Sequence, residues 1–377
     1  MATPYALIPH FSLDFLVYLL VLSVFTMADS ARPRYTSIIS FGDSMTDTGN
    51  ALIAEPELNQ VFGKLPYGTT YFGRPTGRQS DGRLVVDFIA HAFGLPPPPP
   101  YLGGLSQDFR HGVNFAVGGA TALDAPLIPG EGIKQGYLNY SLSVQLKWFE
   151  ELKPSLCHSL KDCRTYFDRT LFLVGEFGIN DYGNEFLDNV EINKLLPRIP
   201  SVVEAISSAT ERLIEHGAVE LLVPGSTAIG CMPVCLTSGA SADKTDYDPR
   251  NQCLKAINDF SEFHNALLRR ALSRLQKKYP EVRITYADYY GPTLAFANFP
   301  NVLVGFSNGA LRSCCGGGGR YNFNWSAWCG KPGSEVHGDP STFVSWDGVH
   351  LTDAAHRILA GTLIKQLADL PPWRPKA

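Results

Sequence analysis

Near its start the chain carries the stretch Thr36-Ser37-Ile38-Ile39-Ser40-Phe41-Gly42-Asp43-Ser44-Met45-Thr46-Asp47-Thr48-Gly49-Asn50. Its apolar half, residues 36–41, predicts a buried β-strand. Gly42 permits a tight exit from that strand, and Asp43 or Ser44 can cap a following helix. A serine at such a strand-to-helix turn has an exposed hydroxyl and an oriented backbone N–H, which suits a nucleophile whose own amide also binds an oxyanion. Because Gly-Asp-Ser is also common in plain turns, this interpretation depends on the rest of the chain.

Further apolar runs alternate with helical patterns along the sequence. Strands are expected at 112–121, 170–175, 218–223 and 282–288. Helices are expected at 84–93, 142–152, 199–216, 251–279 and 352–370, with the second of them ending before Pro154. Such alternation indicates an α/β fold with a parallel sheet and helices on both faces. We interpret His264, which lies on the apolar stripe of the 251–279 helix, as a core or interface residue.

Composition narrows the class of protein. The 377 residues are 45% hydrophobic and 18% charged, as in ordinary globular proteins, and they suffice for one large domain or two small ones. The formal net charge is −4, and no basic stripe is present. Nucleic-acid binding therefore receives no support.

The N-terminus is typical of a secretory signal. Residues 15–26 are almost entirely apolar, a length too short to span a bilayer and suited to a signal core. Small residues follow, so cleavage is expected after Ser30 or, alternatively, after Ala28. The competing interpretation is a buried N-terminal helix or membrane anchor, and residues 1–14 lack the usual Lys or Arg. We expect a signal peptide at 1–30, a single domain at 31–377, secretion, and no stable membrane insertion.

The cysteines favour disulfide bonds. There are eight: Cys157, Cys163, Cys231, Cys235, Cys253, Cys314, Cys315 and Cys329. An even number behind a signal peptide suggests disulfides, although eight cysteines allow 105 pairings. Cys157 and Cys163 are close enough to close a local loop. Cys314 or Cys315 can reach back to Cys329 around the glycine run at 316–319.

Zinc is the alternative use of these cysteines. No pair has the Cys-x-x-Cys spacing, and Cys231 and Cys235 are one residue too far apart for it. We therefore favour disulfides and expect neither a metal nor a cofactor. Two sequons, at Asn139 and Asn324, are usable for glycosylation only in a secreted protein.

Four stretches lie where ligands bind in open α/β sheets: three follow expected strands, and the fourth precedes the last expected helix. They contain Ser44, Gly119, Asn180 and the segment 346–350. In that segment Asp347 lies three residues before His350, so its carboxylate can accept a hydrogen bond from the imidazole. Such a pair fixes the histidine tautomer and stabilises the imidazolium that forms when histidine takes a proton from a serine.

An ester carbonyl attacked by that serine becomes an oxyanion, which needs hydrogen-bond donors. The backbone N–H groups of Ser44 and Gly119 and the side-chain amide of Asn180 can supply them. Each motif also has a plain interpretation: Asp347-x-x-His350 as a helix cap or half of a metal site, and the others as turns. Their joint occurrence in this order on this architecture favours catalysis.

Four blocks of the chain resemble the plant GDSL-type esterase/lipase family of SGNH hydrolases. They are Phe-Gly-Asp-Ser at 41–44, Asn-Phe-Ala-Val-Gly-Gly-Ala-Thr at 114–121, Gly-Ile-Asn-Asp at 178–181, and Trp-Asp-Gly-Val-His-Leu-Thr at 346–352. Further similar stretches occur at 77–83, 229–233, 314–316 and 321–324. The sequence departs from the pattern at Met45, where the family name has leucine, and a swap of such similar volume should have little effect.

The resemblance implies a flavodoxin-like three-layer α/β/α sandwich, the SGNH hydrolase fold. It also implies Ser44 as nucleophile, His350 as base and Asp347 as its partner, with Ser44, Gly119 and Asn180 forming the oxyanion hole. The expected activity is that of a secreted serine esterase acting on a small-molecule or polysaccharide acyl ester, such as an acetylated wall glycan, a lipid or a specialised-metabolite ester. The alternatives are an acyltransferase that uses the same acyl-enzyme and an inactive carbohydrate-binding protein of the cell wall. The sequence leaves the oligomeric state open.

Overall fold

The structure is a computed structural model that describes residues 34–104, 107–124, 140–187, 192–300 and 305–371. The expected signal peptide at 1–30 and the sequon at Asn139 lie outside the described residues. From Tyr35 onward the described residues form one compact unit. No helix within the described ranges is long and apolar enough to cross a membrane.

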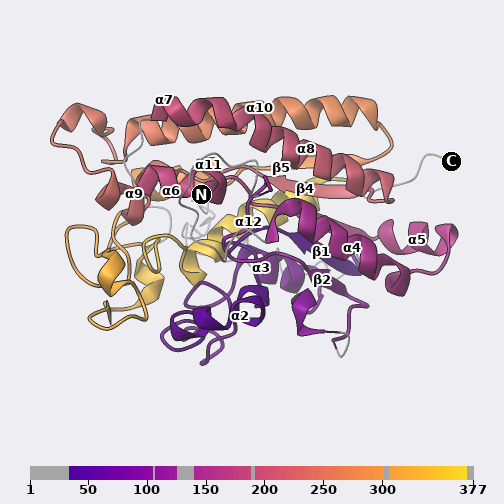
Figure 1. The fold of residues 1–377 in the computed structure, drawn as a ribbon, viewed down its shortest axis with the longest axis horizontal. Coiled ribbons are helices and arrows are strands. Elements are labelled where there is room, and N and C mark those ends of the chain that lie inside the picture. The colour runs from indigo at the N-terminus through magenta and orange to yellow at the C-terminus, as the bar shows by residue number, and fades with distance from the viewer. Residues whose placement is uncertain (1–33, 105–106, 125–139, 188–191, 301–304, 372–377) are drawn as a thin grey trace, which may run out of the picture. The chain divides into compact units, whose positions relative to one another are not determined.

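A five-stranded parallel sheet lies at the centre of this unit (Figure 1). The strands are β1 (Ser37–Phe41), β2 (Gly112–Asn114), β3 (Thr170–Val174), β4 (Glu220–Pro224) and β5 (Arg283–Ala287). Their order in the sheet is β2-β1-β3-β4-β5, the flavodoxin-like order, which reverses direction between β1 and β3. Ligands bind outside the carboxyl ends of strands at such a reversal, and Ser44 follows β1.

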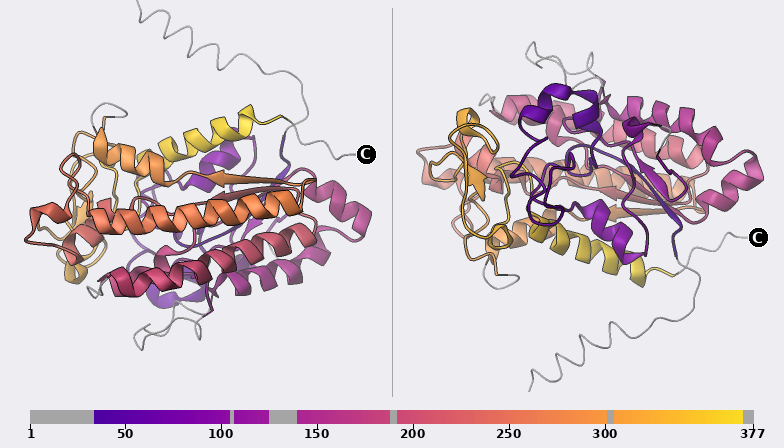
Figure 2. Two further views of the ribbon diagram at one scale, coloured as in Figure 1. Left: turned by 90° about the horizontal axis from the view of Figure 1, so that it is seen from above. Right: turned by 90° about the horizontal axis from the view of Figure 1, so that it is seen from below.

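Helices cover both faces of the sheet. The first face carries α4 (Leu142–Leu156), α8 (Ile199–Glu215) and α10 (Lys255–Lys278). The second face carries α3 (Val85–Ala92), α11 (Tyr290–Asn298) and α12 (Asp353–Asp369). Figure 2 shows α8 and α10 in the view from above and α3 and α12 in the view from below. The expected three-layer α/β/α fold is therefore confirmed.

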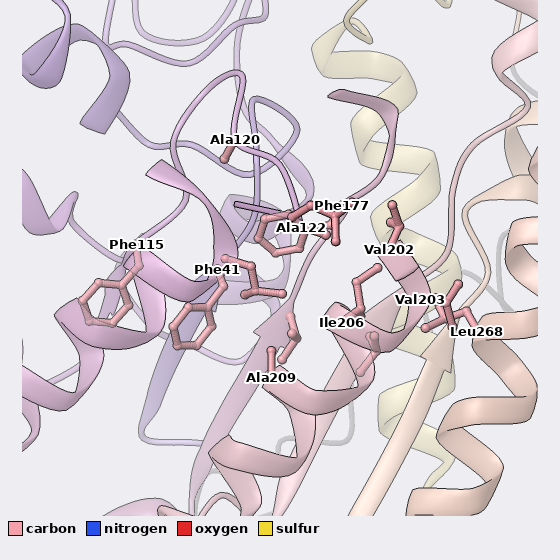
Figure 3. Packing of buried hydrophobic residues seen from close by; sticks show 14 of the residues in the cluster. Phe41, Phe115, Ala120, Ala122, Phe177, Val202, Val203, Ile206, Ala209 and Leu268 are labelled. Carbon is pink, nitrogen blue, oxygen red and sulfur yellow. The ribbon is translucent and has the colours of Figure 1, made fainter. Parts of the chain in front are cut away.

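The alternation of side chains along β1 explains why its sequence is apolar on both sides. Ile39 and Phe41 belong to the core under α4, α8 and α10, whereas Ile38 belongs to the core under α3 and α12. Phe41 stacks on Phe115 with 5.3 Å between ring centroids. Figure 3 shows the two rings beside each other and, further along the same cluster, the α8 side chains of Val202, Val203 and Ile206. This packing anchors the strand that presents Ser44.

Shorter helices and strands connect the elements of these layers along the chain. They are α2 (Asn50–Ala54), α5 (Leu160–Phe167), α6 (Ile179–Leu187), α7 (Ile192–Leu195), α9 (Pro233–Ser238), β6 (Cys315–Gly316) and β7 (Glu335–Val336). Strands β6 and β7 pair antiparallel inside the long glycine-rich region 308–345. Apart from a helix after the Ser44 turn, which is α2, the sequence patterns had predicted none of these elements.

Three expected boundaries were wrong. Strand β2 ends at Asn114 because the side chain of that residue turns back to bond Thr46 O and the backbone N–H of Ala116. Helix α4 continues through Pro154 to Leu156, where the proline lies in the last turn and removes one hydrogen bond only. Helix α10 begins at Lys255, and not at residue 251, because Gln252 has a positive φ of 62° and breaks the helical path.

Three disulfide bonds join cysteines of the described chain: Cys157–Cys163, Cys231–Cys253 and Cys315–Cys329. The expected local loop and the expected link back to Cys329 are both present. Cys235 and Cys314 are buried free thiols. The zinc interpretation of Cys231 with Cys235 is wrong, because Cys231 is bonded to Cys253.

Candidate active site

Ser44 lies on a tight turn directly after β1. Gly42 has φ +151°, and a Cβ there would lie 2.9 Å from Gly175 O, so only glycine fits this exit. Asp43 holds the turn, because its Oδ1 accepts from Met45 N at 2.9 Å and its carbonyl accepts from Thr46 N at 3.1 Å. The turn leaves Ser44 8% exposed, at the carboxyl end of the sheet.

The helix that follows is not capped by Asp43 or Ser44, contrary to expectation. The carboxylate of Asp47 does this instead, accepting from Asn50 N at 2.6 Å and from Ala51 N at 2.9 Å. The same carboxylate accepts from Gly118 N at 2.8 Å. Asp47 thereby ties the Ser44 turn to the paired glycines of the second motif.

Ser44, His350 and Asp347 form a continuous hydrogen-bonded chain. His350 Nε2 lies 3.0 Å from Ser44 Oγ, and His350 Nδ1 lies 2.7 Å from Asp347 Oδ2. The second oxygen, Asp347 Oδ1, accepts from His350 N at 2.8 Å and from Val349 N at 3.0 Å. The carboxylate is therefore fixed by its own loop, and it orients the imidazole ring toward the serine.

The segment 78–83 supports the histidine loop from the other side. Ser80 Oγ donates to Leu351 O at 3.0 Å, and Asp353 N donates to Asp81 Oδ1 at 2.8 Å. Arg83 forms an ion pair of 2.9 Å with Asp353. These bonds hold both the end of the loop and the start of α12, which explains how a distant stretch of sequence positions His350.

Tyr67 also belongs to the site, although the sequence analysis missed it. Its hydroxyl donates to Asp347 Oδ2 at 2.8 Å, and the tyrosine is fully buried. Burial opposes ionisation of Asp347, but the charge of His350 and the hydrogen bonds that the carboxylate accepts hold its pKa below its usual value. Burial, with the neighbouring Asp347, raises the pKa of Tyr67 well above its usual value. Asp347 is therefore ionised, and Tyr67 remains a neutral donor to it.

Two backbone N–H groups are free to bind an oxyanion. Within the described part of the chain, neither Ser44 N nor Gly119 N donates to a protein acceptor. Gly119 has φ +83°, a conformation that favours glycine. Unpaired donors beside a candidate nucleophile match the requirement of an oxyanion hole.

The third predicted donor, Asn180, lies in the first turn of α6. Its Nδ2 donates to Asp43 Oδ2 at 3.0 Å and to Ala120 O at 2.9 Å. The amide is thus placed between the Ser44 turn and the Gly119 turn. To bind an oxyanion, it must exchange one of these two bonds for the new acceptor.

Buried carboxyl groups lie behind the Ser44 turn. Burial raises the pKa of Asp43 to about 7, partly offset by hydrogen bonding and by His350. Burial, together with neighbouring Asp43, raises the pKa of Glu176 well above its usual value, and neither Glu176 oxygen is hydrogen-bonded within the described chain. These raised pKa values limit the negative charge behind the Ser44 turn.

Aromatic rings flank the candidate base. Trp328 lies nearly parallel to His350, with 6.5 Å between centroids and 24° between planes. Phe62 meets His350 edge-on at 6.3 Å and Trp328 at 5.3 Å. On another side, a small cavity of about 30 Å³ adjoins His350 and is lined mostly by apolar side chains such as Met232 and Val349.

The remaining candidates have structural roles. His264 is buried in α10, where its Nδ1 lies 3.0 Å from Tyr182 OH and burial lowers its pKa to about 4, so it is a core residue as expected. Among the described residues, no group of three or more His, Cys, Asp or Glu side chains is arranged to hold a metal ion. Asn324 is exposed, and its side chain accepts from Ser326 N at 2.9 Å.

The chain is similar to known proteins over most of its length. Residues 38–363 match the model of the GDSL-like lipase/acylhydrolase family. A GDSL esterase/lipase of Arabidopsis thaliana is 45% identical, aligned over 90% of this chain and 93% of that protein. A sinapine esterase of Brassica napus is 44% identical over 92% of this chain and 90% of its own length. Among solved structures, a gut microbial diltiazem-metabolizing enzyme aligns with 89% of this chain at 13% identity and a TM-score of 0.33. The alignment covers 47% of that protein.

Proposed function

The chain belongs to the GDSL-like lipase/acylhydrolase family and is a carboxylic ester hydrolase, and we propose that it works through Ser44, His350 and Asp347 by way of an acyl-enzyme. One observation carries this proposal: His350 Nε2 lies 3.0 Å from Ser44 Oγ while His350 Nδ1 lies 2.7 Å from Asp347 Oδ2. A base within hydrogen-bond reach of the hydroxyl, and itself oriented by a carboxylate, is the arrangement that activates a serine.

In the first half of the reaction, Ser44 Oγ attacks the ester carbonyl carbon and passes its proton to His350 Nε2. The carbonyl oxygen takes up the negative charge and accepts hydrogen bonds from Ser44 N, Gly119 N and Asn180 Nδ2. The tetrahedral centre then collapses, the bond to the alcohol oxygen breaks, and the imidazolium gives its proton to that oxygen. Asp347 stabilises the imidazolium throughout by its negative charge.

In the second half, a water molecule attacks the acyl-enzyme at the same carbonyl carbon. His350 takes a proton from this water and later returns one to Ser44 Oγ, which leaves as the free hydroxyl. The products are one alcohol and one carboxylic acid. An acceptor alcohol in place of the water gives the acyltransferase alternative, with the same residues in the same roles.

We further propose that the protein is secreted and acts outside the cell. Support comes from the apolar core at 15–26, from three disulfides, which are typical of oxidising compartments, and from an exposed sequon at Asn324. N-terminal sequencing of protein recovered from the culture medium should then give Ala31 or Asp29. A soluble intracellular chain that still begins at Met1 and has eight free thiols would contradict the secretion proposal.

The activity itself is tested by turnover of a panel of acetylated glycans, short-chain acyl esters and hydroxycinnamate esters, each with and without an acceptor alcohol. We expect free acid as the main product, formed by the wild type and lost in Ser44→Ala. Acyl transfer to the alcohol as the main reaction would identify an acyltransferase. Equal turnover by the wild type and Ser44→Ala would show that Ser44 is not the nucleophile.

A further inference from the structure

An aromatic ridge leads from the surface to the candidate base; we define it as Phe62, Phe323, Trp325 and Trp328. Trp328 lies against His350, as described above. Trp325 packs on Trp328 with 5.6 Å between centroids and on Phe323 with 5.0 Å. Even so, Trp325 is 43% exposed, which is unusual for so large an apolar residue. Its indole is therefore two ring contacts away from His350 and open to solvent.

The ridge is held in place by several independent bonds. The Cys315–Cys329 disulfide closes the loop on which both tryptophans lie. Trp328 Nε1 donates to Asp347 O at 2.8 Å, which joins the ridge to the catalytic loop. Lys331 Nζ donates to Trp325 O at 3.2 Å, which fixes the backbone at the exposed indole. The exposed ring thus sits on a supported backbone, which lowers the entropic cost of binding a ligand.

The proposed reaction indicates which half of an ester lies on the side of the candidate site that carries the aromatic ridge. Ser44 N and Gly119 N bind the carbonyl oxygen, whereas His350 Nε2 gives its proton to the departing alcohol oxygen. The alcohol half must therefore leave past His350, whose ring is flanked by Trp328 and Phe62. Beyond Trp328, the next residue of the ridge that is exposed to solvent is Trp325.

We propose that Trp325 is a binding platform for a ring in the alcohol half of the ester, an inference that rests on the proposed function. A pyranose and an aryl group both present a ring face that can pack against an indole. A positively charged alcohol is disfavoured, because the ammonium group of Lys331 lies beside the same turn. Asn324 and Ser326, both exposed and polar, flank Trp325.

The test uses three acetate esters that differ only in the alcohol: butyl acetate, benzyl acetate and an acetylated methyl pyranoside. Trp325→Ala should lower kcat/KM for at least one ring-bearing ester about two- to tenfold, through KM, with butyl acetate unchanged. Trp325→Phe, which keeps a ring, should retain part of the effect. A fall confined to the pyranoside identifies a sugar, and a fall confined to the benzyl ester identifies an aryl alcohol.

Ser326→Ala is the matched control, because Ser326 is exposed in the same turn and its loss removes the sequon without removing the indole. It should leave KM unchanged for all three esters. Equal effects of Trp325→Ala on all three esters, no effect on any, or the same effect from Ser326→Ala would overturn the proposal.

Measuring the binding of esters to the Ser44→Ala variant tests the platform without turnover. Benzyl acetate and the acetylated pyranoside are titrated separately into Ser44→Ala and into Ser44→Ala/Trp325→Ala. At least one should bind about two- to tenfold more weakly to the double variant. Unchanged affinity for both would reject the platform even if the hydrolase mechanism holds. Weaker binding to the double variant together with an inactive wild type would retain the platform and reject the hydrolase.

Discussion

The Tyr67 hydroxyl donates a hydrogen bond of 2.8 Å to Asp347 Oδ2, and the bond is fully buried. The same oxygen lies 2.7 Å from His350 Nδ1, so one carboxylate oxygen contacts both the tyrosine and the histidine. A donor to a carboxylate stabilises its negative charge and makes it less basic. In the proposed mechanism Tyr67 therefore acts on His350 through Asp347, as a positioning residue.

Tyr67→Phe should move the acid limb of the pH profile of kcat/KM to higher pH. Without the tyrosine bond the carboxylate favours the imidazolium more strongly, and only neutral imidazole can take the serine proton. We expect a loss of about tenfold in kcat/KM at neutral pH, the lower end for a hydrogen bond to a charged group. Asp347→Asn should cost more, about 10⁴ as in the serine-protease triad. A Tyr67→Phe profile that overlays the wild type would show that the bond has no influence on the base.

Asn180→Ala tests the proposed oxyanion hole. Removal of one such donor costs about 10²–10³ in kcat, and we expect a loss in that range with little change in KM. Asn308→Ala, which truncates an exposed asparagine of the glycine-rich region, is the control and should retain full activity. If kcat of Asn180→Ala stays within about threefold of wild type, the amide serves only to join Asp43 and Ala120.

Glu176→Gln should make thermal stability less dependent on pH. A carboxyl group whose pKa is raised by folding stabilises the protein at acid pH, and this contribution is lost as pH rises through the folded-state pKa. Asp43, with a pKa of about 7, and Glu176, raised for the same reason of burial, should together lower Tm from about pH 5 to pH 8. Glutamine has no proton to lose, so differential scanning calorimetry should give a shallower fall for this variant.

The exposed Glu335→Gln is the control for that experiment and should follow the wild-type curve. A Glu176→Gln curve as steep as the wild type would mean that Glu176 does not contribute to the pH dependence.

Local spacing is what made the candidate site predictable. The strand and turn around Ser44, and the carboxylate three residues before His350, are encoded within single short stretches. The parallel sheet follows from alternating strand and helix patterns, and its topology brings the ends of β1, β2 and β3 together.

Contacts between distant segments were not predictable in this way. Tyr67 and Asp347 are 280 residues apart, and no spacing rule joins them. Asp47 replaced Asp43 as the helix cap because the turn after β1 runs several residues further before α2 begins. The continuation of α4 through Pro154 reflects tertiary packing, which overrides local preference in the last turn of a helix.

The central claim is that Ser44 is the nucleophile activated by His350, and covalent labelling with a fluorophosphonate tests it most directly. Intact-mass measurement of wild-type protein should show one added phosphonyl group, and peptide mapping should place it on Ser44. Ser44→Ala, with an unchanged Tm, should remain unlabelled, and His350→Ala should label far more slowly. Labelling of Ser44→Ala at the wild-type rate, or a mapped adduct on any other residue, would contradict the account.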